Sequence, residues 1–339
     1  MRFLPVIVSN LCEDLAMKVK SAQKNNLQSV AVVIPAFKVR DHILGVIESI
    51  GKQVQHIIVI DDACPEKSGE LVKKKFPNSR VQVIFHEKNM GVGGAVKSGY
   101  KRAIELGIDI VVKIDGDGQM DVSKIDEFTK PIKNGAADYS KGNRFFELQQ
   151  IRQMPAIRIL GNLVLSFMTK ISSGYWDIFD PTNGYTAISL TALKRLPLDK
   201  ISNGFFFESD ILFRLNTIKA VVVDIPMDAQ YGDEQSNLKI LHEIPKFIKG
   251  NSKNCFKRLI YSYYLREINI ASFELLAGLF FVGFGVLRGV TAWIAASSSG
   301  IPTPNGTISL SVLCLIIGIQ LLLGFVNTDT SSMPKRPLD

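Results

Sequence analysis

The acidic motif Asp115-Gly-Asp117-Gly-Gln119 is the part of this sequence best suited to chemistry, and it directly follows the mainly apolar run of residues 110–114. Two carboxylates two positions apart on an extended turn can share one hard divalent cation, Mg²⁺ or Mn²⁺, which in turn neutralises a diphosphate. The motif also favours an ordinary turn and resembles the start of a calcium loop, but Asp126 stands where an EF-hand loop needs its twelfth-position Glu. It therefore indicates a metal site for a nucleotide-diphosphate leaving group.

A second acidic pair, Asp61-Asp62, follows the apolar residues 57–60. A carboxylate at a strand end can accept hydrogen bonds from a base imide or a ribose hydroxyl, and so fix a nucleoside without touching the reacting bond. One of the two could instead cap the next helix. Because capping explains both residues less well, the pair indicates a nucleoside site.

The glycine-rich segment Asn89-Met-Gly91-Val-Gly93-Gly94 opens a predicted helix, so its backbone amides could bind phosphate. The segment is weak evidence by itself. Val96 occupies the place of the third glycine in a dinucleotide-binding Gly-x-Gly-x-x-Gly motif, and this argues against a dehydrogenase.

These motifs need a scaffold, and from residue 30 onward short β-branched runs alternate with longer amphipathic segments. This order predicts an α/β fold with right-handed crossovers and a mainly parallel, doubly wound sheet. The predicted strands cover residues 30–35, 56–60, 81–85 and 108–114, and the predicted helices cover residues 41–51, 66–76 and 94–106. Ligands bind beyond the carboxyl ends of such strands, where Pro35-Ala36 and both acidic pairs fall.

Beyond residue 140 the alternation loosens, and we expect this half to form the acceptor side. The pattern predicts a helix over residues 155–171, a loop over residues 174–184, a helix over residues 206–215 and a closing strand over residues 221–225.

Taken together, the motifs resemble glycosyltransferase family 2, and within it the polyisoprenyl-phosphate glycosyltransferases that include dolichol-phosphate mannose synthase. The resemblance covers residues 29–239, and its specificity comes from the order and spacing of motifs that are each modest. The motifs are Val33-Ile34-Pro35-Ala36-Phe37, Ile60-Asp61-Asp62, Asn89 with Gly91 and Gly93, Asp115-Gly-Asp117-Gly-Gln119, Gly142-Asn143-Arg144, and Asp180-Pro-Thr182-Asn183-Gly184-Tyr185.

The resemblance implies a GT-A fold that acts on a nucleotide sugar with inversion at the anomeric carbon. Asp115, Asp117 and Gln119 would hold Mg²⁺ or Mn²⁺ on the donor diphosphate. The other residues expected at the donor are Pro35, Ala36, Asp61, Asp62, Asn89, Gly91 and Gly93. Arg144 and Arg158 match arginines that bind the acceptor phosphate, and Asp180 matches an acidic residue assigned as base or acceptor contact.

Two arginines suit a phosphate acceptor, because guanidinium groups bind phosphate bidentately and keep their charge. A lipid phosphate is already anionic near neutral pH and needs no dedicated general base, whereas a sugar hydroxyl would need Asp180 or Glu208 to serve as one. Taken one at a time, Arg144, Arg158 and Glu208 could equally form surface or structural ion pairs.

One segment departs from the lipid-using relatives, which often carry a basic residue followed by a Ser-Lys pair. Residues 231–239 read Tyr-Gly-Asp-Glu-Gln-Ser-Asn-Leu-Lys, so the lysine is displaced and acidic residues intervene. The departure leaves a different acceptor, and a different sugar, open.

The composition of the 339-residue chain, 46% hydrophobic and 21% charged, hides an apolar excess after residue 267. Two nearly charge-free stretches, residues 268–289 and 308–326, approach or reach the ~20 residues that span hydrocarbon. Arg266 before the first span, and Lys335 and Arg336 after the second, predict that both ends of this hairpin lie in the cytosol. Arg288 is expected at the far interface with Trp293, although a functional partner for it within the membrane stays open.

A basic segment precedes the first span, and it accounts for much of the formal net charge of +8. Apolar residues recur there at helical spacing between lysines over residues 240–264, which predicts amphipathic helices on a membrane surface. Ordinary helices packed on the catalytic core are the alternative. The position of the charge favours anionic lipid as a partner over nucleic acid.

Two smaller features carry little function. Cys12, Cys64, Cys255 and Cys314 have neither metal-ligand nor disulfide-framework spacing, so we expect free thiols. Asn305-Gly-Thr307 matches a glycosylation sequon, but its place beside the predicted bilayer favours a plain turn.

The sequence thus predicts five regions: residues 1–28 as a leader or extra helix rather than a cleaved signal peptide, 29–238 as a GT-A domain, 239–266 as juxtamembrane helices, 267–327 as a transmembrane hairpin, and 328–339 as a cytosolic tail. The predicted function is metal-dependent transfer of a sugar from a nucleotide diphosphate to a polyprenyl phosphate. A hydroxyl acceptor on a lipid-linked or growing glycan, and a non-catalytic sugar-nucleotide sensor or scaffold, are the alternatives. A homo-oligomer is left open.

Overall fold

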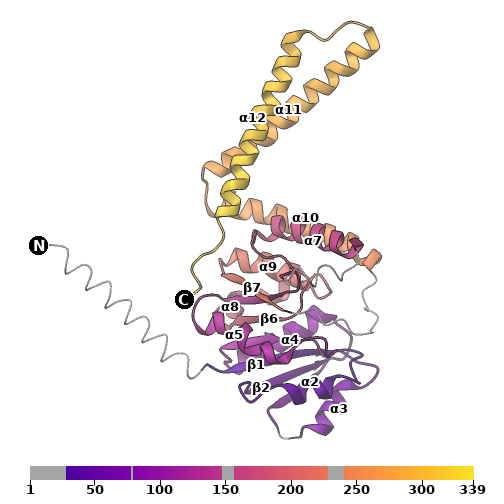
Figure 1. The fold of residues 1–339 in the computed structure, drawn as a ribbon, viewed down its shortest axis with the longest axis vertical. Helices are drawn as coiled ribbons and strands as arrows, with labels where there is room; N and C mark the ends of the chain where they lie inside the picture. Colours follow the sequence, from indigo (N-terminus) through magenta and orange to yellow (C-terminus); the bar gives the residue numbers. More distant parts are fainter. Residues whose placement is uncertain (1–27, 78, 147–155, 228–239) are drawn as a thin grey trace, which may run out of the picture. The chain divides into compact units, whose positions relative to one another are not determined.

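The computed structural model describes residues 28–77, 79–146, 156–227 and 240–339 (Figure 1). Their contacts form two compact units. The first unit contains the described residues up to Cys255 together with Pro334–Asp339, and the second unit is Phe256–Met333.

A seven-stranded sheet in the order β3-β2-β1-β4-β6-β5-β7 forms the centre of the first unit. Its strands are β1 (Val30–Ala36), β2 (His56–Asp61), β3 (Val81–Phe85), β4 (Ile110–Lys113), β5 (Tyr139–Asn143), β6 (Thr186–Ser189) and β7 (Val222–Pro226). β1 is parallel to β2 and β4, β2 is parallel to β3, and β5 is parallel to β7, whereas β6 is antiparallel to β4 and β5. The predicted α/β fold with a mainly parallel sheet is therefore confirmed.

The register brings the chemistry-bearing motifs to one edge of this sheet. Ala36 at the end of β1 pairs with Asp61 at the end of β2. On the other side of β1, Val33 pairs with Lys113, the last residue of β4. Asp62 and Asp115 follow these two strands directly, so both acidic motifs lie at the carboxyl edge, where ligands of such sheets bind.

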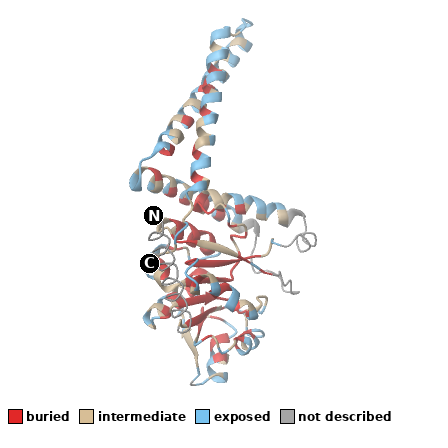
Figure 2. Cartoon of the chain, turned by 60° about the vertical axis from the view of Figure 1, so that its left-hand side comes forward, coloured by how far each residue is buried: buried red, intermediate tan, exposed pale blue. Residues whose placement is uncertain are grey.

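Helices pack on both faces of the sheet, and the buried strands lie between them (Figures 1 and 2). The helices of this part are α2 (Ile43–Ser49), α3 (Ser68–Lys75), α4 (Val92–Glu105), α5 (Ile125–Lys133), α8 (Leu190–Arg195) and α9 (Phe207–Thr217), with short 3₁₀ turns at Val122–Lys124 and Leu198–Lys200. Because side chains alternate along a strand, Val33 joins the core cluster that contains Tyr100 of α4, while Val32 joins the one that contains Phe128 of α5.

The sequence pattern finds β1 to β4 and misses β5 and β6. β5 has the sequence Tyr-Ser-Lys-Gly-Asn, and all five residues are buried. Ser, Lys, Gly and Asn are not strand-forming types, and the side chains of Lys141 and Asn143 are satisfied by partners far along the chain. A polar strand of this kind has no apolar pattern to recognise.

Two further helices, α7 (Ala156–Ser173) and α10 (Ile240–Ile260, in the first unit as far as Cys255), expose several apolar side chains. On α7 the exposed residues are Leu160, Leu163, Val164 and Phe167, and the buried ones include Ser166, Thr169, Ser172 and Ser173. On α10, Ile244 and Ile248 are exposed, whereas Asn251 and Asn254 are buried. Ser172 Oγ donates to Asn251 Oδ1 at 2.6 Å, so the two helices contact each other through polar groups.

The second unit is a helical hairpin. A π-helical turn, Tyr261–Arg266, is followed by α11 (Ile270–Ser299) and α12 (Asn305–Ser331). Both helices are long and apolar enough to be candidate membrane spans, with mean hydropathies of 2.1 and 2.5. Length and composition alone are weak evidence that they cross a membrane.

Three local predictions in the C-terminal half have clear outcomes. The two amphipathic stretches predicted over residues 240–264 lie in one continuous α10 and the π-helical turn. The turn predicted at Asn305-Gly-Thr307 is wrong, because the amides of Thr307 and Ile308 donate to the carbonyl of Pro304 and start α12 there. Cys64, Cys255 and Cys314 keep their thiols out of any disulfide, as expected, and Cys12 lies outside the described residues.

A buried ion pair connects the ends of the hairpin. The Arg258 guanidinium binds both oxygens of Asp329, at 2.6 and 3.1 Å, and the Tyr263 hydroxyl donates to Asp329 Oδ1 at 2.6 Å. Arg258 and Asp329 are 3% and 2% exposed, so water does not screen the pair. Both partners are needed, because a buried charge that loses its partner is strongly destabilising.

Asp329→Asn is therefore expected to lower the free energy of unfolding by about 3 kcal/mol, since it leaves the Arg258 guanidinium without a buried counter-charge. Thermal unfolding of the detergent-solubilised protein measures this. The matched control is Asp199→Asn, because Asp199 also pairs with a cation, Lys101 at 2.7 Å, but on the surface. Equal melting temperatures for the two variants would contradict the structural role of the buried pair.

Candidate active site

The acidic turn after β4 presents two partly exposed carboxylates. The side chain of Asp115 is 30% exposed, and Asp117 is also partly exposed. Asp117 Oδ1 accepts the amide of Gln119 at 3.0 Å, and Gly118 has a φ of 78°, which only glycine adopts easily. The hydrogen bond to the backbone amide of Gln119 therefore fixes the side chain of Asp117 within this turn.

The donor set of this turn fits a divalent cation that arrives with a nucleotide. Among the described residues, no group of three or more His, Cys, Asp or Glu side chains could hold a metal ion. Mg²⁺ needs no such cage, because it is usually bound by one or two carboxylates together with water and substrate phosphates. Asp115 and Asp117 would supply two hard anionic oxygen ligands. The side-chain amide of Gln119, the third predicted ligand, belongs to the same turn.

Below the turn lies a buried cation that the sequence analysis did not single out. Lys113 is 1% exposed, and its Nζ lies 2.8 Å from Asp115 Oδ1 and 3.4 Å from Glu208 Oε1. Burial alone would lower the pKa of Lys113, but Asp115 and then Glu208 outweigh it and hold that pKa above its ordinary value. Lys113 therefore stays charged and orients Asp115 from beneath.

The carboxylates of the second acidic pair are directed at the chain itself. Asp61 accepts the amides of Cys64 at 2.7 Å and Gly69 at 2.6 Å, and so fixes the loop that leads into α3. The alternative that one of the two residues caps the next helix thus applies to Asp61, whose carboxylate accepts an amide in the first turn of α3. Since Asp61 is only 3% exposed, any part it has in nucleoside binding is through the shape of this loop.

Asp62 in turn holds the glycine-rich segment. It accepts the amides of Met90 at 2.9 Å and Gly91 at 2.8 Å, and His86 Nδ1 lies 2.7 Å from its Oδ1. The other ring nitrogen of His86 contacts Ser98 Oγ at 2.8 Å. Asp62 therefore connects the ends of β2 and β3 to the start of α4.

The glycines of the segment permit a close approach of the chain. A Cβ on Gly91 would lie 2.6 Å from the carbonyl oxygen of Asn203, and one on Gly93 would lie 2.4 Å from that of Ser202. The amide of Gly94 donates to Asn203 at 3.1 Å. Packing accounts for these glycines, while Asn89 is exposed and accepts the Gly91 amide at 2.9 Å.

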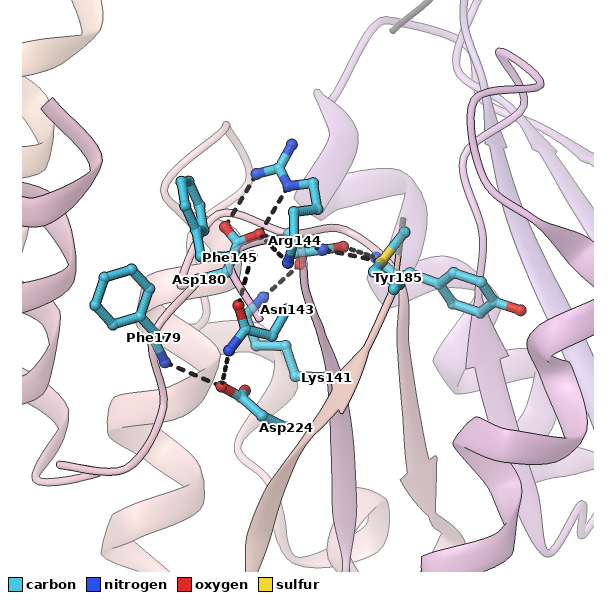
Figure 3. A network of polar contacts seen from close by, with 10 residues as sticks. Lys141, Asn143, Arg144, Phe145, Phe179, Asp180, Tyr185 and Asp224 are labelled. Carbon is cyan, nitrogen blue, oxygen red and sulfur yellow. Dashed lines mark hydrogen bonds and ion pairs between the residues drawn. The ribbon is translucent and has the colours of Figure 1, made fainter. Parts of the chain in front are cut away.

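Directly after β5, Arg144 pairs with the carboxylate of Asp180 (Figure 3). Arg144 donates to Asp180 through Nε at 2.7 Å and through Nη2 at 2.9 Å. Burial alone would raise the pKa of Asp180, which is 1% exposed, but the Arg144 guanidinium outweighs it and lowers that pKa. The two residues that the sequence places 36 positions apart thus form one unit.

A polar network extends this pair into the sheet, as Figure 3 shows. Asn183 Nδ2 donates to Asp180 at 3.3 Å, and Lys141 Nζ donates to the carbonyl of Asn183. Asn143 Nδ2 donates to Asp224 Oδ2 at 2.8 Å. Lys141 and Asp224 were not predicted, because no local signal shows which partners a buried charge will meet.

Gly184 connects the two sides of the site. A Cβ there would lie 2.3 Å from Lys113 Nζ and 2.6 Å from Asp115 Oδ2. The loop that carries Asp180 can therefore pass against the donor carboxylate only because residue 184 has no side chain.

Neither candidate base has the environment that a general base needs. Asp180 is committed to Arg144, and its lowered pKa makes it a weak proton acceptor. Burial raises the pKa of Glu208, but this residue is 8% exposed and faces Lys113. Arg158 falls within α7, its side chain lies outside the described part, and so do residues 231–239.

The sheet, with β6 reversed and an acidic turn beyond β4, defines the GT-A class of transferase fold. A family profile described as glycosyl transferase family 2 matches residues 31–196. A UDP-N-acetylglucosamine–dolichyl-phosphate N-acetylglucosaminyltransferase from Methanococcus voltae is 30% identical over 216 residues, which are 60% of this chain and 86% of that protein. The chain therefore belongs to glycosyltransferase family 2, and it is a glycosyltransferase rather than the scaffold weighed as an alternative.

Further relatives agree with this assignment. A polyprenol monophosphomannose synthase from Mycolicibacterium smegmatis is 26% identical over 206 residues, 59% of this chain and 77% of that protein. Among solved structures, a glucosyl-3-phosphoglycerate synthase from Mycobacterium tuberculosis, in complex with Mn²⁺, UDP and phosphoglyceric acid, superposes with a TM-score of 0.52 at 18% identity, covering 70% of this chain and 81% of that chain. At this identity the superposition shows the shared fold alone.

Proposed function

We propose that the protein is a metal-dependent, inverting glycosyltransferase that moves a sugar from a nucleotide diphosphate to a polyprenyl phosphate at the cytosolic face of a membrane. The observation that carries this proposal is the state of the acceptor side, where Arg144 is fixed by Asp180 and where the two predicted bases, Asp180 and Glu208, are both buried. A phosphate acceptor fits such a site, because it brings its own negative charge and binds a guanidinium bidentately.

On the donor side, Asp115, Asp117 and Gln119 would hold Mg²⁺ or Mn²⁺. The ion supplies charge neutralisation to the diphosphate as it leaves. Lys113 holds Asp115 in place, and the loops fixed by Asp61 and Asp62 shape the space for the nucleoside. The Mn²⁺ and UDP bound to the mycobacterial structural neighbour support a divalent ion with a nucleotide here.

On the acceptor side, Asp180 would aim the Arg144 guanidinium at the acceptor phosphate, whose oxygen attacks the anomeric carbon from the face opposite the diphosphate. Inversion follows from one such displacement. Relatives named for transfer to dolichyl phosphate and for polyprenol monophosphomannose synthesis support this class of acceptor.

Three features support a membrane location. α11 and α12 are candidate spans, and the exposed faces of α7 and α10 are apolar. Lysines 246, 249 and 253 are exposed on α10, where they suit anionic lipid headgroups. The chain also returns to the first unit after the hairpin, since the Leu338 amide donates to the Asp138 carboxylate at 3.0 and 3.2 Å. An even number of candidate spans and this return support a topology with both ends of the hairpin on one side of the membrane.

The outward apolar face of α7 leads to a testable expectation about its surroundings. In a Trp176→Phe, Trp293→Phe background reconstituted in anionic nanodiscs, Leu163→Trp is expected to be quenched by brominated lipid, because position 163 is exposed on the apolar face. Lys73→Trp on α3 is the control, since position 73 is exposed among lysines. Equal quenching at the two positions would argue against an α7 that lies in the bilayer interface.

The function itself is tested by incubating the purified full chain with Mg²⁺, undecaprenyl or dolichyl phosphate, and a panel of labelled nucleotide sugars. Extraction into organic solvent separates lipid-linked product from donor. A lipid-linked sugar with one donor supports the proposal and identifies the base and the sugar together. Sugar transfer only to a glycan hydroxyl, with no lipid-phosphate product from any donor, would refute the acceptor assignment.

A further inference from the structure

Lys141 is a fully buried lysine on β5 for which the proposed mechanism has so far given no role. It is 0% exposed, and its Nζ donates to the backbone carbonyl of Asn183. Taking an ammonium group out of water is costly, so a lysine persists in a core only where its charge and donors are used.

Lys141 contacts the loop that carries Asp180, the partner of Arg144. Within this loop the Asn183 amide donates to the Asp180 carbonyl at 3.3 Å, and Asn183 Nδ2 donates to the Asp180 carboxylate at 3.3 Å. Asp180 in turn holds the Arg144 guanidinium through two hydrogen bonds. A short chain of contacts therefore leads from Lys141 through Asn183 and Asp180 to Arg144.

The charges that act on Lys141 come from the loop after α7 and from α9, β7 and β4. Asp180 on the loop, Glu208 on α9 and Asp224 on β7 favour its ammonium form, and Lys113 on β4 opposes it. Burial is nevertheless the largest influence, and it lowers the pKa of Lys141 to about 8. Asn143 and the Phe179 amide donate to Oδ2 of Asp224, whereas the hydrogen bond of Lys141 Nζ goes to the Asn183 carbonyl, so the lysine contacts the loop and not Asp224.

We propose that Lys141 is a positioning residue of the acceptor site: its ammonium fixes the loop of residues 180–184 so that Asp180 aims the Arg144 guanidinium at the acceptor phosphate. This inference rests on the proposed function, because it assigns Lys141 to the binding of that acceptor. A residue with only a packing role would influence stability without discriminating between the two substrates.

The positioning role predicts a particular pH dependence. The ammonium is present below about pH 8 and is lost as the pH rises through that value. The acceptor phosphate keeps its negative charge over this range, so its own ionisation does not weaken binding. Wild-type kcat/KM for the acceptor is therefore expected to fall above about pH 8, while KM for the nucleotide sugar stays constant.

Lys141→Met tests the role directly, since methionine fills a similar space without the donor or the charge. KM for polyprenyl phosphate is expected to rise about 10- to 100-fold, because the charge-assisted hydrogen bond from Lys141 to the loop is lost. KM for the nucleotide sugar should stay within about twofold of the wild-type value. The alkaline fall of kcat/KM should disappear. Lys133→Met is the matched control, because Lys133 is a partly buried lysine on α5 that pairs with Asp126 outside the site.

Lys141→Arg provides a rescue, because arginine keeps the charge at all of these pH values; activity should return in part, without the alkaline fall. An unchanged acceptor KM in Lys141→Met, in a preparation where the wild type transfers sugar to polyprenyl phosphate, would overturn the assignment of Lys141 alone. No wild-type transfer to polyprenyl phosphate would overturn it together with the proposed function. Should Lys141→Met fail to fold, a flat wild-type profile between about pH 7 and 9.5 overturns the inference.

Discussion

Asp117→Asn is expected to lower kcat at least about a hundredfold, because under the proposed function the counter-ion of the donor diphosphate would lose one of its two carboxylate ligands. In the wild type, Asp117 Oδ1 accepts a hydrogen bond from the backbone amide of Gln119 at 3.0 Å. Asparagine keeps an Oδ1 that can accept the same bond, so the turn after β4 should keep its structure. The variant should also need a higher Mg²⁺ or Mn²⁺ concentration for half-maximal activity. Initial rates over a metal titration at saturating donor measure both effects.

Asp126→Asn is the control for this experiment. Asp126 is an exposed carboxylate close in sequence, and its pair with Lys133 at 3.6 Å lies on α5 and not at the carboxyl edge of the sheet. Its metal titration should match that of the wild type. A fully active Asp117→Asn enzyme with an unchanged metal requirement would show that the ion, if one is used, is bound elsewhere.

The second large effect is expected from Arg144→Lys, which keeps the charge and removes the planar fork. KM for the polyprenyl phosphate should rise about 10- to 100-fold, because an ammonium cannot pair with Asp180 through two nitrogens and still offer a further donor to phosphate. KM for the nucleotide sugar should change little, since Arg144 lies on the acceptor side. Steady-state kinetics with each substrate varied in turn make the comparison.

Arg102→Lys supplies the corresponding control, because Arg102 is an arginine of α4 that pairs with Glu105 at 2.9 Å on the surface. Its kinetic constants should stay at the wild-type values. If Arg144→Lys raised both substrate KM values equally, the arginine would be holding the whole site together and would have no specific part in acceptor binding.

The donor half of the fold could be predicted because its strands are apolar runs with clear ends. Residues 57–60 of β2 and residues 111 and 112 of β4 are buried between helices, so local pattern and final environment agree. β5 could not be predicted in this way. Its Lys141 and Asn143 are tolerated in the core only because Asn183 and Asp224, 42 and 81 residues away, complete their hydrogen bonds.

The residues of the candidate site also differ in whether a local sequence pattern could predict them. Asp115 and Asp117 are recognisable from spacing alone, since the turn that presents them is local. Lys113 has no such signal, because a lysine within an apolar strand becomes meaningful only when Asp115 and Glu208 are seen beside it. For Asp61 the sequence identified a residue of the site region, whereas the structure shows a carboxylate occupied by two amides of its own loop.

The inverted arrangement of α7 and α10 has a practical consequence for handling the protein. Leucine, valine and phenylalanine cover the outside of α7, while its serines and threonine face inward. Exposed apolar surface is therefore present on the first unit as well as on the helical hairpin. A fragment truncated after residue 255 would still expose the apolar face of α7. Detergent would therefore remain necessary to keep this fragment monodisperse.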